Sequence, residues 1–226
     1  MSNAATPYGP LLKTGHARLV VVAGACPEGM TFSIASGSAR VGRGDVEVLL
    51  AEDNEVSPNH ATLTYRGTTL TVTDEGSLNG VYLRIRAPHE LQDGDWFRAG
   101  DQYFVFSKLA EGEAFHGPDG TRVFTSPQRK GTFTVRQVLR DGHIGISSTS
   151  SRDEVSVGGE GSSIAFVGDE HLDEKHCRVY RASDGRYLIE DLGSVNGTYV
   201  RIRSTENLVD GDVVIVGGEV LRVEVT

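Results

Sequence analysis

The sequence contains little of what secreted and membrane proteins require. Only two cysteines, Cys26 and Cys177, occur in 226 residues. We therefore expect no disulfide framework and a reducing, cytoplasmic location. No apolar run approaches the roughly 20 residues that span a bilayer, and no charged segment followed by an apolar stretch opens the chain. These absences predict a protein with no membrane partner.

Positive charge is scarce as well. Lys and Arg number 22 against 31 Asp and Glu, which gives a formal net charge of −9. Residues 1–110 carry 9 basic and 12 acidic side chains, and residues 111–226 carry 13 and 19. Neither half has the basic surface of a general nucleic-acid binder, so no nucleic-acid partner is expected.

Helical spacing is absent over any stretch of ten residues. Short segments rich in β-branched and aromatic residues recur instead, bounded by Gly, Asp, Asn or Pro, and the 28 glycines suit tight turns. These segments are 18–22, 31–34, 61–65, 69–73, 81–85, 103–107, 133–139, 177–181, 186–191, 198–202, 212–216 and 220–225. The pattern predicts an all-β fold built from antiparallel β-sandwiches.

One unusual turn sequence occurs twice in the chain. The stretch DEGSLNGVYLRIR at 74–86 returns as EDLGSVNGTYVRIR at 190–203, and His60 and His176 are 116 residues apart. Such self-similarity indicates a duplicated domain. The predicted organisation is a flexible tail at 1–16, a first domain at 17–109, a linker at 110–131 and a second domain at 132–226.

Groups that could perform catalysis or hold a cofactor are hard to find. Of the seven histidines only His171 and His176 are close in sequence, and their spacing beside Cys177 is not a zinc-binding pattern. Phosphate-binding glycine loops that open a helix are also missing. We therefore expect neither an enzyme nor a metal or cofactor site.

Three short motifs occur in order in the first copy: Gly42-Arg43, then Ser57 followed by His60, then Ser77-Leu78-Asn79-Gly80. This series resembles the forkhead-associated (FHA) domain, and the second copy repeats it in degenerate form. The family is an eleven-stranded β-sandwich that binds phosphothreonine peptides through loops at one end. The resemblance covers nearly the whole chain and implies two FHA-type domains in tandem.

The resemblance also implies residue roles. Arg43 would bind the phosphate as a bidentate fork, Ser57 would donate its hydroxyl, and Asn79 would hold the peptide backbone. Leu78 and Arg84 are further candidates for peptide contacts, although the recurrence of Arg84 as Arg201 favours a structural salt bridge. Three residues of the motif are expected to be structural, namely Gly42, His60 and Gly80.

Some residues depart from the family pattern. In the first copy, Pro58 and Leu78 replace residues that often donate hydrogen bonds to the ligand, so we expect a weaker site than usual. In the second copy Gly159 aligns with Arg43 and Asp173 with Ser57, whereas Asn196 is retained. A carboxylate beside a phosphate dianion is repulsive, so the second domain is not expected to bind phosphothreonine.

The resemblance implies a phosphothreonine-dependent adaptor in bacterial serine/threonine-kinase signalling. Its partner would be a phosphorylated kinase, a kinase substrate or the protein's own N-terminal tail. Thr6 and Thr14 are candidate phosphorylation sites in that tail. The alternative is a protein-interaction scaffold in which neither domain binds phosphate.

Overall fold

The computed structural model describes residues 17–34, 37–109, 116–124, 126, 131–150 and 153–225. Thr6, Thr14 and most of the expected linker lie outside these residues. The described part contains twenty strands and a single 3-10 turn, Arg140–Gly142. The prediction of an all-β fold is confirmed. None of the described residues form a helix long and apolar enough to cross a membrane.

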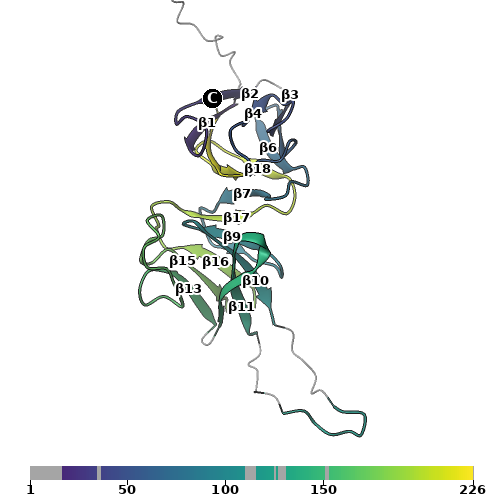
Figure 1. The fold of residues 1–226 in the computed structure, drawn as a ribbon. Helices are drawn as coiled ribbons and strands as arrows, with labels where there is room; N and C mark the ends of the chain where they lie inside the picture. Colours follow the sequence, from purple (N-terminus) through teal and green to yellow (C-terminus); the bar gives the residue numbers. More distant parts are fainter. Residues whose placement is uncertain are drawn as a thin grey trace, which may run out of the picture. The chain divides into compact units, whose positions relative to one another are not determined.

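Two compact units make up the chain (Figure 1). Unit 1 contains the described residues up to Leu83 and from Ile202 onward, and its strands form two groups of five hydrogen-bonded neighbours, each described below as a sheet of the unit. The strands of the first sheet, in spatial order, are β7 (Val81–Arg84), β19 (Val213–Val216), β20 (Glu219–Val225), β1 (Ala17–Ala23) and β2 (Thr31–Ile34). Those of the second are β18 (Glu206–Leu208), β6 (Thr69–Asp74), β5 (Ala61–Arg66), β3 (Gly37–Gly42) and β4 (Val48–Leu49).

Unit 2 spans Arg84–Arg201 and has the same two-sheet organisation. Its first sheet contains β12 (Ile144–Thr149), β11 (Phe133–Val138), β10 (Gln102–Lys108), β9 (Trp96–Ala99) and β17 (Thr198–Arg201). Its second sheet contains β14 (Ile164–Ala165), β13 (Glu154–Gly158), β15 (Cys177–Arg181), β16 (Tyr187–Asp191) and β8 (His89–Glu90).

Alternating burial explains why each pair of sheets packs face to face. In β5, Ala61, Leu63 and Tyr65 are buried while the residues between them are not. Because successive side chains of a strand point to opposite faces, this alternation places one apolar face of each sheet inward. The buried apolar residues of unit 1 come from both of its sheets and form one core, and those of unit 2 form another.

The two units do not coincide with the two sequence repeats. Unit 1 takes its last three strands, β18 to β20, from the second repeat, and unit 2 takes β8 to β10 from the first. Figure 1 shows the yellow C-terminal strands among the purple and blue ones, and the teal strands β9 and β10 beside the green ones. The expected ranges 17–109 and 132–226 therefore describe repeats, while each compact unit combines strands of both.

The register of the exchanged strands is regular. Strand β1 pairs with β20 antiparallel, with Arg18 opposite Glu224, and these two side chains form a salt bridge. In unit 2, β11 pairs with β10 in the equivalent register, with Thr134 opposite Ser107. Each unit thus completes its first sheet with the other repeat's final hairpin.

Both cysteines are free thiols and buried. Burial raises the pKa of Cys177 to about 12, and burial together with the nearby Glu219 carboxylate raises the pKa of Cys26 to about 11. Since the thiolate is the nucleophile, neither cysteine should react with iodoacetamide at pH 8 in the folded protein, and both should react in urea. Mass spectrometry of the alkylated protein measures this, and rapid labelling of either thiol without denaturant would contradict the burial described.

Candidate functional site

The turn at residues 76–80 follows β6 and is held by its own side chains. Asp74 Oδ1 accepts a hydrogen bond from the N–H of Ser77 (2.8 Å), and Ser77 Oγ accepts one from the N–H of Gly80 (2.9 Å). These bonds satisfy the backbone donors inside the turn. Leu78 and Asn79 consequently stand at its exposed tip, where Leu78 is 86% exposed.

A buried histidine connects this turn to the loop at residues 53–60. His60 has no exposed surface; its Nδ1 accepts from the N–H of Ser57 (3.0 Å) and its Nε2 contacts the carbonyl of Gly80 (3.1 Å). Because Nδ1 accepts, the ring proton is on Nε2, which donates to Gly80. His60 therefore holds loop 53–60 against turn 76–80 and lies below the surface.

Two further hydrogen bonds join the loop and the turn at the surface. Ser57 Oγ accepts from the N–H of Leu78 (3.2 Å), and Asn79 Nδ2 donates to the carbonyl of Glu55 (2.7 Å). In this arrangement the hydroxyl hydrogen of Ser57 and the side-chain carbonyl of Asn79 have no partner among the described residues. Each is available to a ligand.

Arg43 enters the same network from the end of β3. Its backbone N–H donates to Ser57 O (3.1 Å) and its Nε donates to Val56 O (3.2 Å), while the residue as a whole is exposed. Within the described chain no carboxylate pairs with this guanidinium. The close approach of loop 53–60 to the end of β3 requires Gly42, since a Cβ there would lie 2.3 Å from the carbonyl oxygen of Pro58.

Three of the residues predicted from the sequence are thus brought together: Arg43, Ser57 and Asn79. The guanidinium supplies fixed positive charge, the hydroxyl a donor and the amide an acceptor, which is the set needed by a phosphorylated, extended peptide. Arg84 has a different place. It belongs to unit 2, where its guanidinium lies 3.4 Å from the carbonyl oxygens of Ser194 and Val195, so its contacts are structural ones in that unit.

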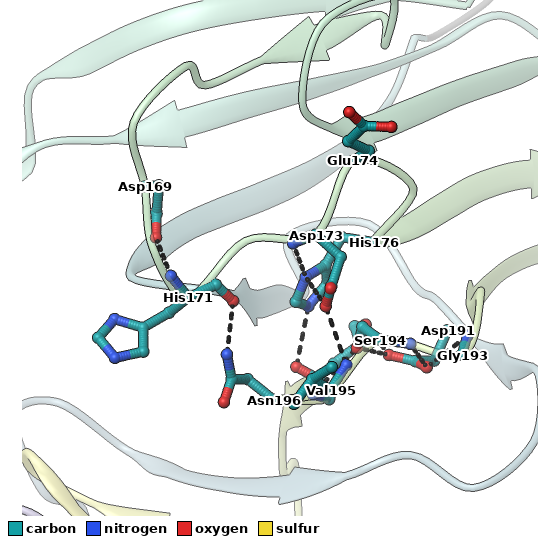
Figure 2. Close-up of polar contacts among 12 residues, drawn as sticks. Asp169, His171, Asp173, Glu174, His176, Asp191, Gly193, Ser194, Val195 and Asn196 are labelled. Atoms are coloured by element: carbon teal, nitrogen blue, oxygen red, sulfur yellow. Dashed lines mark hydrogen bonds and ion pairs between the residues drawn. The ribbon is translucent and has the colours of Figure 1, made fainter.

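Unit 2 repeats the loop and turn with different chemistry (Figure 2). His176 is buried, accepts from the N–H of Asp173 (3.2 Å) and contacts the carbonyl of Gly197 (3.0 Å). Asn196 Nδ2 donates to the carbonyl of His171 (3.0 Å). The scaffold that positions Asn79 in unit 1 is therefore preserved around Asn196.

The surface groups of unit 2 are the ones that differ. Asp173 Oδ2 accepts from the N–H of Val195 (2.9 Å), in the place where Ser57 Oγ accepts from Leu78. A carboxylate can make this structural bond as well as a hydroxyl can, but it has no proton left to donate. Gly159 supplies no side chain where Arg43 stands in unit 1. Unit 2 thus keeps the structural contacts and lacks both the guanidinium and the hydroxyl.

The family model described as FHA domain matches residues 39–100 and 155–217, which together are more than half of the chain. The chain belongs to the FHA domain family. The two matches confirm the tandem FHA arrangement predicted from the repeated motifs.

Proteins similar to this chain include a mycobacterial transcriptional regulator. The transcriptional regulatory protein EmbR of Mycobacterium tuberculosis is 32% identical over 81 residues, which are 34% of this chain and 21% of EmbR. The chain therefore matches only about a fifth of the length of this curated relative. A solved structure of the FhaA FHA domain complexed with the intracellular domain of Rv3910 is also similar. The match covers 92% of this chain and 99% of the chain in that structure, at 13% identity and a TM-score of 0.35. Another, from work on phosphothreonine-dependent FHA domain interactions, covers 92% and 95%, at 13% identity and a TM-score of 0.36.

One group that includes the start of the unit 2 loop has the donor types of a metal site. The ligand atoms of Asp101, Asp169 and His171 lie within 4.8 Å of one another. Protein donors already occupy them: Asp169 accepts from the N–H groups of His171 and Asp101, and Asp101 is bound to His171 Nδ1 (3.0 Å). Burial raises the pKa of Asp101, but His171 and Arg98 lower it by more. These contacts explain the cluster without a metal.

The sequence motifs missed two residues that shape the FHA site of unit 1. Asp53 is 6% exposed; its Oδ1 accepts from the N–H of Glu55 and its Oδ2 from that of Gly218, both at 2.7 Å. Val56 is buried and presents its carbonyl to Arg43. The available signal was the recurrence of Asp53 as Asp169 at the same repeat position.

Proposed function

We propose that this protein is a phosphothreonine-dependent binding protein in which unit 1 binds the phosphate and unit 2 does not. The observation that carries the proposal is a difference between equivalent positions. Unit 1 holds an exposed guanidinium without a carboxylate partner beside a serine hydroxyl that is free to donate. Unit 2 has Gly159 and an already hydrogen-bonded Asp173 at the same places.

The phosphate would be bound by Arg43 and Ser57. The Nε of Arg43 is held by Val56, so its terminal nitrogens can approach two phosphate oxygens as a fork. Ser57 can donate its O–H to a third oxygen while it still accepts from Leu78. Anchoring by the protein reduces the side-chain entropy lost on binding, because the groups are already oriented.

The peptide main chain would be bound by turn 76–80. Asn79 offers its side-chain carbonyl to a backbone N–H of an extended peptide, while its Nδ2 stays bonded to Glu55. The exposed Leu78 side chain offers apolar contact to a neighbouring peptide residue. Leu78 therefore replaces a polar contact by an apolar one, which would favour an apolar residue in the ligand.

The ligand would be a phosphorylated protein in serine/threonine-kinase signalling, either a kinase or its substrate. EmbR with a phosphopeptide, and FhaA with an intracellular domain, are solved complexes of similar proteins and motivate this class of partner. The chain's own Thr6 and Thr14, once phosphorylated, would be intramolecular competitors at high effective concentration. Unit 2 would act as a phosphate-independent interaction or structural domain.

A second candidate function is a scaffold in which neither unit binds phosphate. Pro58 favours it, because it has no N–H to offer a ligand, and Leu78 favours it because it has no hydroxyl. A titration of a degenerate phosphothreonine peptide pool and its unphosphorylated twin separates the two functions. We expect saturable binding of the phosphorylated pool only; equal binding of both pools, or of neither, would favour the scaffold.

The comparison of the two units predicts the effect of Ser57→Asp. The new carboxylate should accept from the N–H of Leu78 as Asp173 does from Val195, so the unfolding temperature should change by no more than a few degrees. At about 4 Å a like-charge pair costs about 4 kcal/mol at an effective dielectric of 20, so phosphopeptide binding should fall at least 100-fold.

Calorimetric titration and thermal unfolding measure the two effects of Ser57→Asp. Ser57→Ala is the matched variant, since it removes both the acceptor and the donor without adding charge. Retention of phosphopeptide affinity by Ser57→Asp would show that phosphate is not bound beside this residue.

A further inference from the structure

The loop that carries the proposed phosphate site rests on strands of the other repeat. Asp53 Oδ2, at the start of loop 53–60, accepts from the N–H of Gly218 in the β19–β20 turn (2.7 Å). Gly217 precedes it at φ +63° and packs so closely that a Cβ there would lie 2.6 Å from Val56 Cγ2. Val56 in turn accepts from Arg43 through its carbonyl.

We propose that the phosphopeptide site of unit 1 is composite. The binding groups come from the first repeat, and the β19–β20 turn of the second repeat positions them through Asp53 and Val56. The inference rests on the proposed function of unit 1. It assigns Gly217, Gly218 and Asp53 a positioning role, and it makes phosphate recognition by one repeat dependent on the other.

The same device occurs in unit 2 with the repeats reversed. Asp169 accepts from the N–H of Asp101 (3.3 Å), and Gly100 at φ +56° would place a Cβ 3.0 Å from Leu172 Cβ. Gly100 and Gly217 are equivalent positions of the two repeats, as are Asp53 and Asp169. Each loop is therefore supported by the final hairpin of the other repeat, and two independent sites show the same exchange.

The side chains of the cores explain why the exchange is favoured over pairing within a repeat. In unit 2, Phe106 from the first repeat packs against Phe133 and Tyr187 from the second, with ring centroids 5.3–5.5 Å apart. The equivalent residues of unit 1 are Val223, Ala17 and Leu70, all buried. Pairing within a repeat would set Phe106 against Ala17 and Val223 against Phe133, which would overfill one core and leave the other underpacked.

Matched alanine substitutions at the two equivalent glycines test the composite site in the whole chain. Both Gly217→Ala and Gly100→Ala strain a left-handed backbone and bring a Cβ against the adjoining loop, at 2.6 Å for Gly217 and 3.0 Å for Gly100. A composite site predicts that Gly217→Ala weakens phosphopeptide binding by about tenfold or more, while Gly100→Ala leaves it within about twofold. The reverse pattern would overturn the proposal, because it would place the first repeat's own hairpin under loop 53–60.

A spectroscopic measurement separates positioning from general damage. In Gly217→Ala without peptide, the amide resonances of Val56, Ser57 and Leu78 should shift, while those of the equivalent loop in unit 2 should not. Gly100→Ala should shift the amides around Asp173 and Val195 instead. Equal shifts in both units, or shifts in unit 2 alone for Gly217→Ala, would contradict the assigned role.

Disulfide trapping tests the exchange of the final hairpins between the repeats without any ligand. Its result therefore remains informative even if the protein does not bind phosphate. Arg18 lies opposite Glu224 in the β1–β20 register, within the Cα separation that a disulfide allows. The variant Arg18→Cys/Glu224→Cys should form an intramolecular disulfide in the monomer. Arg18→Cys/Ser107→Cys, the equivalent pair within one repeat, should not form one. A disulfide in the second variant, or a covalent dimer in the first, would overturn exchange within a single chain.

Discussion

Replacing Arg43 by alanine should weaken binding of a phosphothreonine peptide by about 10- to 100-fold, as expected for the loss of a charge-assisted bond worth about 1.5–3 kcal/mol. Arg43 is exposed, and among the described residues its guanidinium is anchored only through Nε, while the backbone N–H bond to Ser57 is kept in the alanine variant. Its removal should therefore leave the fold intact. Calorimetric titration of the whole chain measures the affinity, and thermal unfolding measures the stability.

Arg40 provides the matched control for charge. It lies on β3, the strand that ends just before Arg43, and forms an exposed salt bridge with Glu47 at 3.0 Å. Arg40→Ala changes the net charge by the same amount without touching loop 53–60, so the affinity should stay within about twofold. If both variants lost affinity equally, binding would depend on net charge, and the specific role of Arg43 would be refuted. Arg43→Lys should recover only part of the loss, because a single ammonium cannot form the fork.

Replacing His60 by alanine should have the largest effect on stability. The ring is fully buried and bridges the N–H of Ser57 and the carbonyl of Gly80. Its loss leaves both groups unsatisfied, at about 1–3 kcal/mol each, and opens a cavity, so unit 1 should lose about 3–5 kcal/mol. Phosphopeptide binding should fall with it, since Ser57 and turn 76–80 lose their common support.

His176→Ala is the matched variant in unit 2. It removes the same two bonds, to Asp173 and Gly197, and should cost similar stability. Below the unfolding temperature of either variant, however, only His60→Ala should weaken phosphopeptide binding. Chemical denaturation measures the free energy of unfolding, and titration at low temperature measures the phosphopeptide affinity. A loss of affinity in His176→Ala equal to that in His60→Ala would contradict the division of roles between the units.

Much of the fold could be predicted because it depends on local pattern. Alternating segments such as 61–65 and 69–73 became β5 and β6 within a residue of the expected bounds, since burial of one face fixes the strand period. The order of the motifs also indicated which loops meet, because His60 and the turn at residues 76–80 can both be recognised in the sequence. The structure then supplied the hydrogen bonds that join them.

The exchange of strands could not be predicted in the same way. The hairpins β9–β10 and β19–β20 share length, turn and apolar alternation, so either one can close either unit by pattern alone. The core-facing side chains of the two hairpins differ in volume. That difference decides which unit a hairpin fits only when the strands packed against it are known. For the same reason the recurrence of Asp53 as Asp169 does not predict the contact of Asp53 with Gly218, and the sequence does not assign Arg84 to the turn at Ser194.

The support of the turn is common to both units. In unit 2 the contacts of His176, Ser194 and Asp191 are complete, although Gly159 and Asp173 stand at the positions of Arg43 and Ser57. Burial raises the pKa of Asp191, but hydrogen bonds from Ser194, Thr198 and Gly193 hold it below its ordinary value. The turn therefore stabilises unit 2 without the guanidinium and the hydroxyl that bind phosphate in our proposal for unit 1.

The most direct test of phosphate recognition by unit 1 is a residue-resolved titration of the whole chain with a phosphothreonine peptide and its unphosphorylated twin. Amide resonances from Arg43 to Gly44, Glu55 to Ser57 and Leu78 to Gly80 should shift with the phosphorylated peptide alone. Those around Gly159, Asp173 and Asn196 should stay in place with either peptide. Phosphate-dependent shifts centred on unit 2, or identical shifts with both peptides, would contradict the assignment.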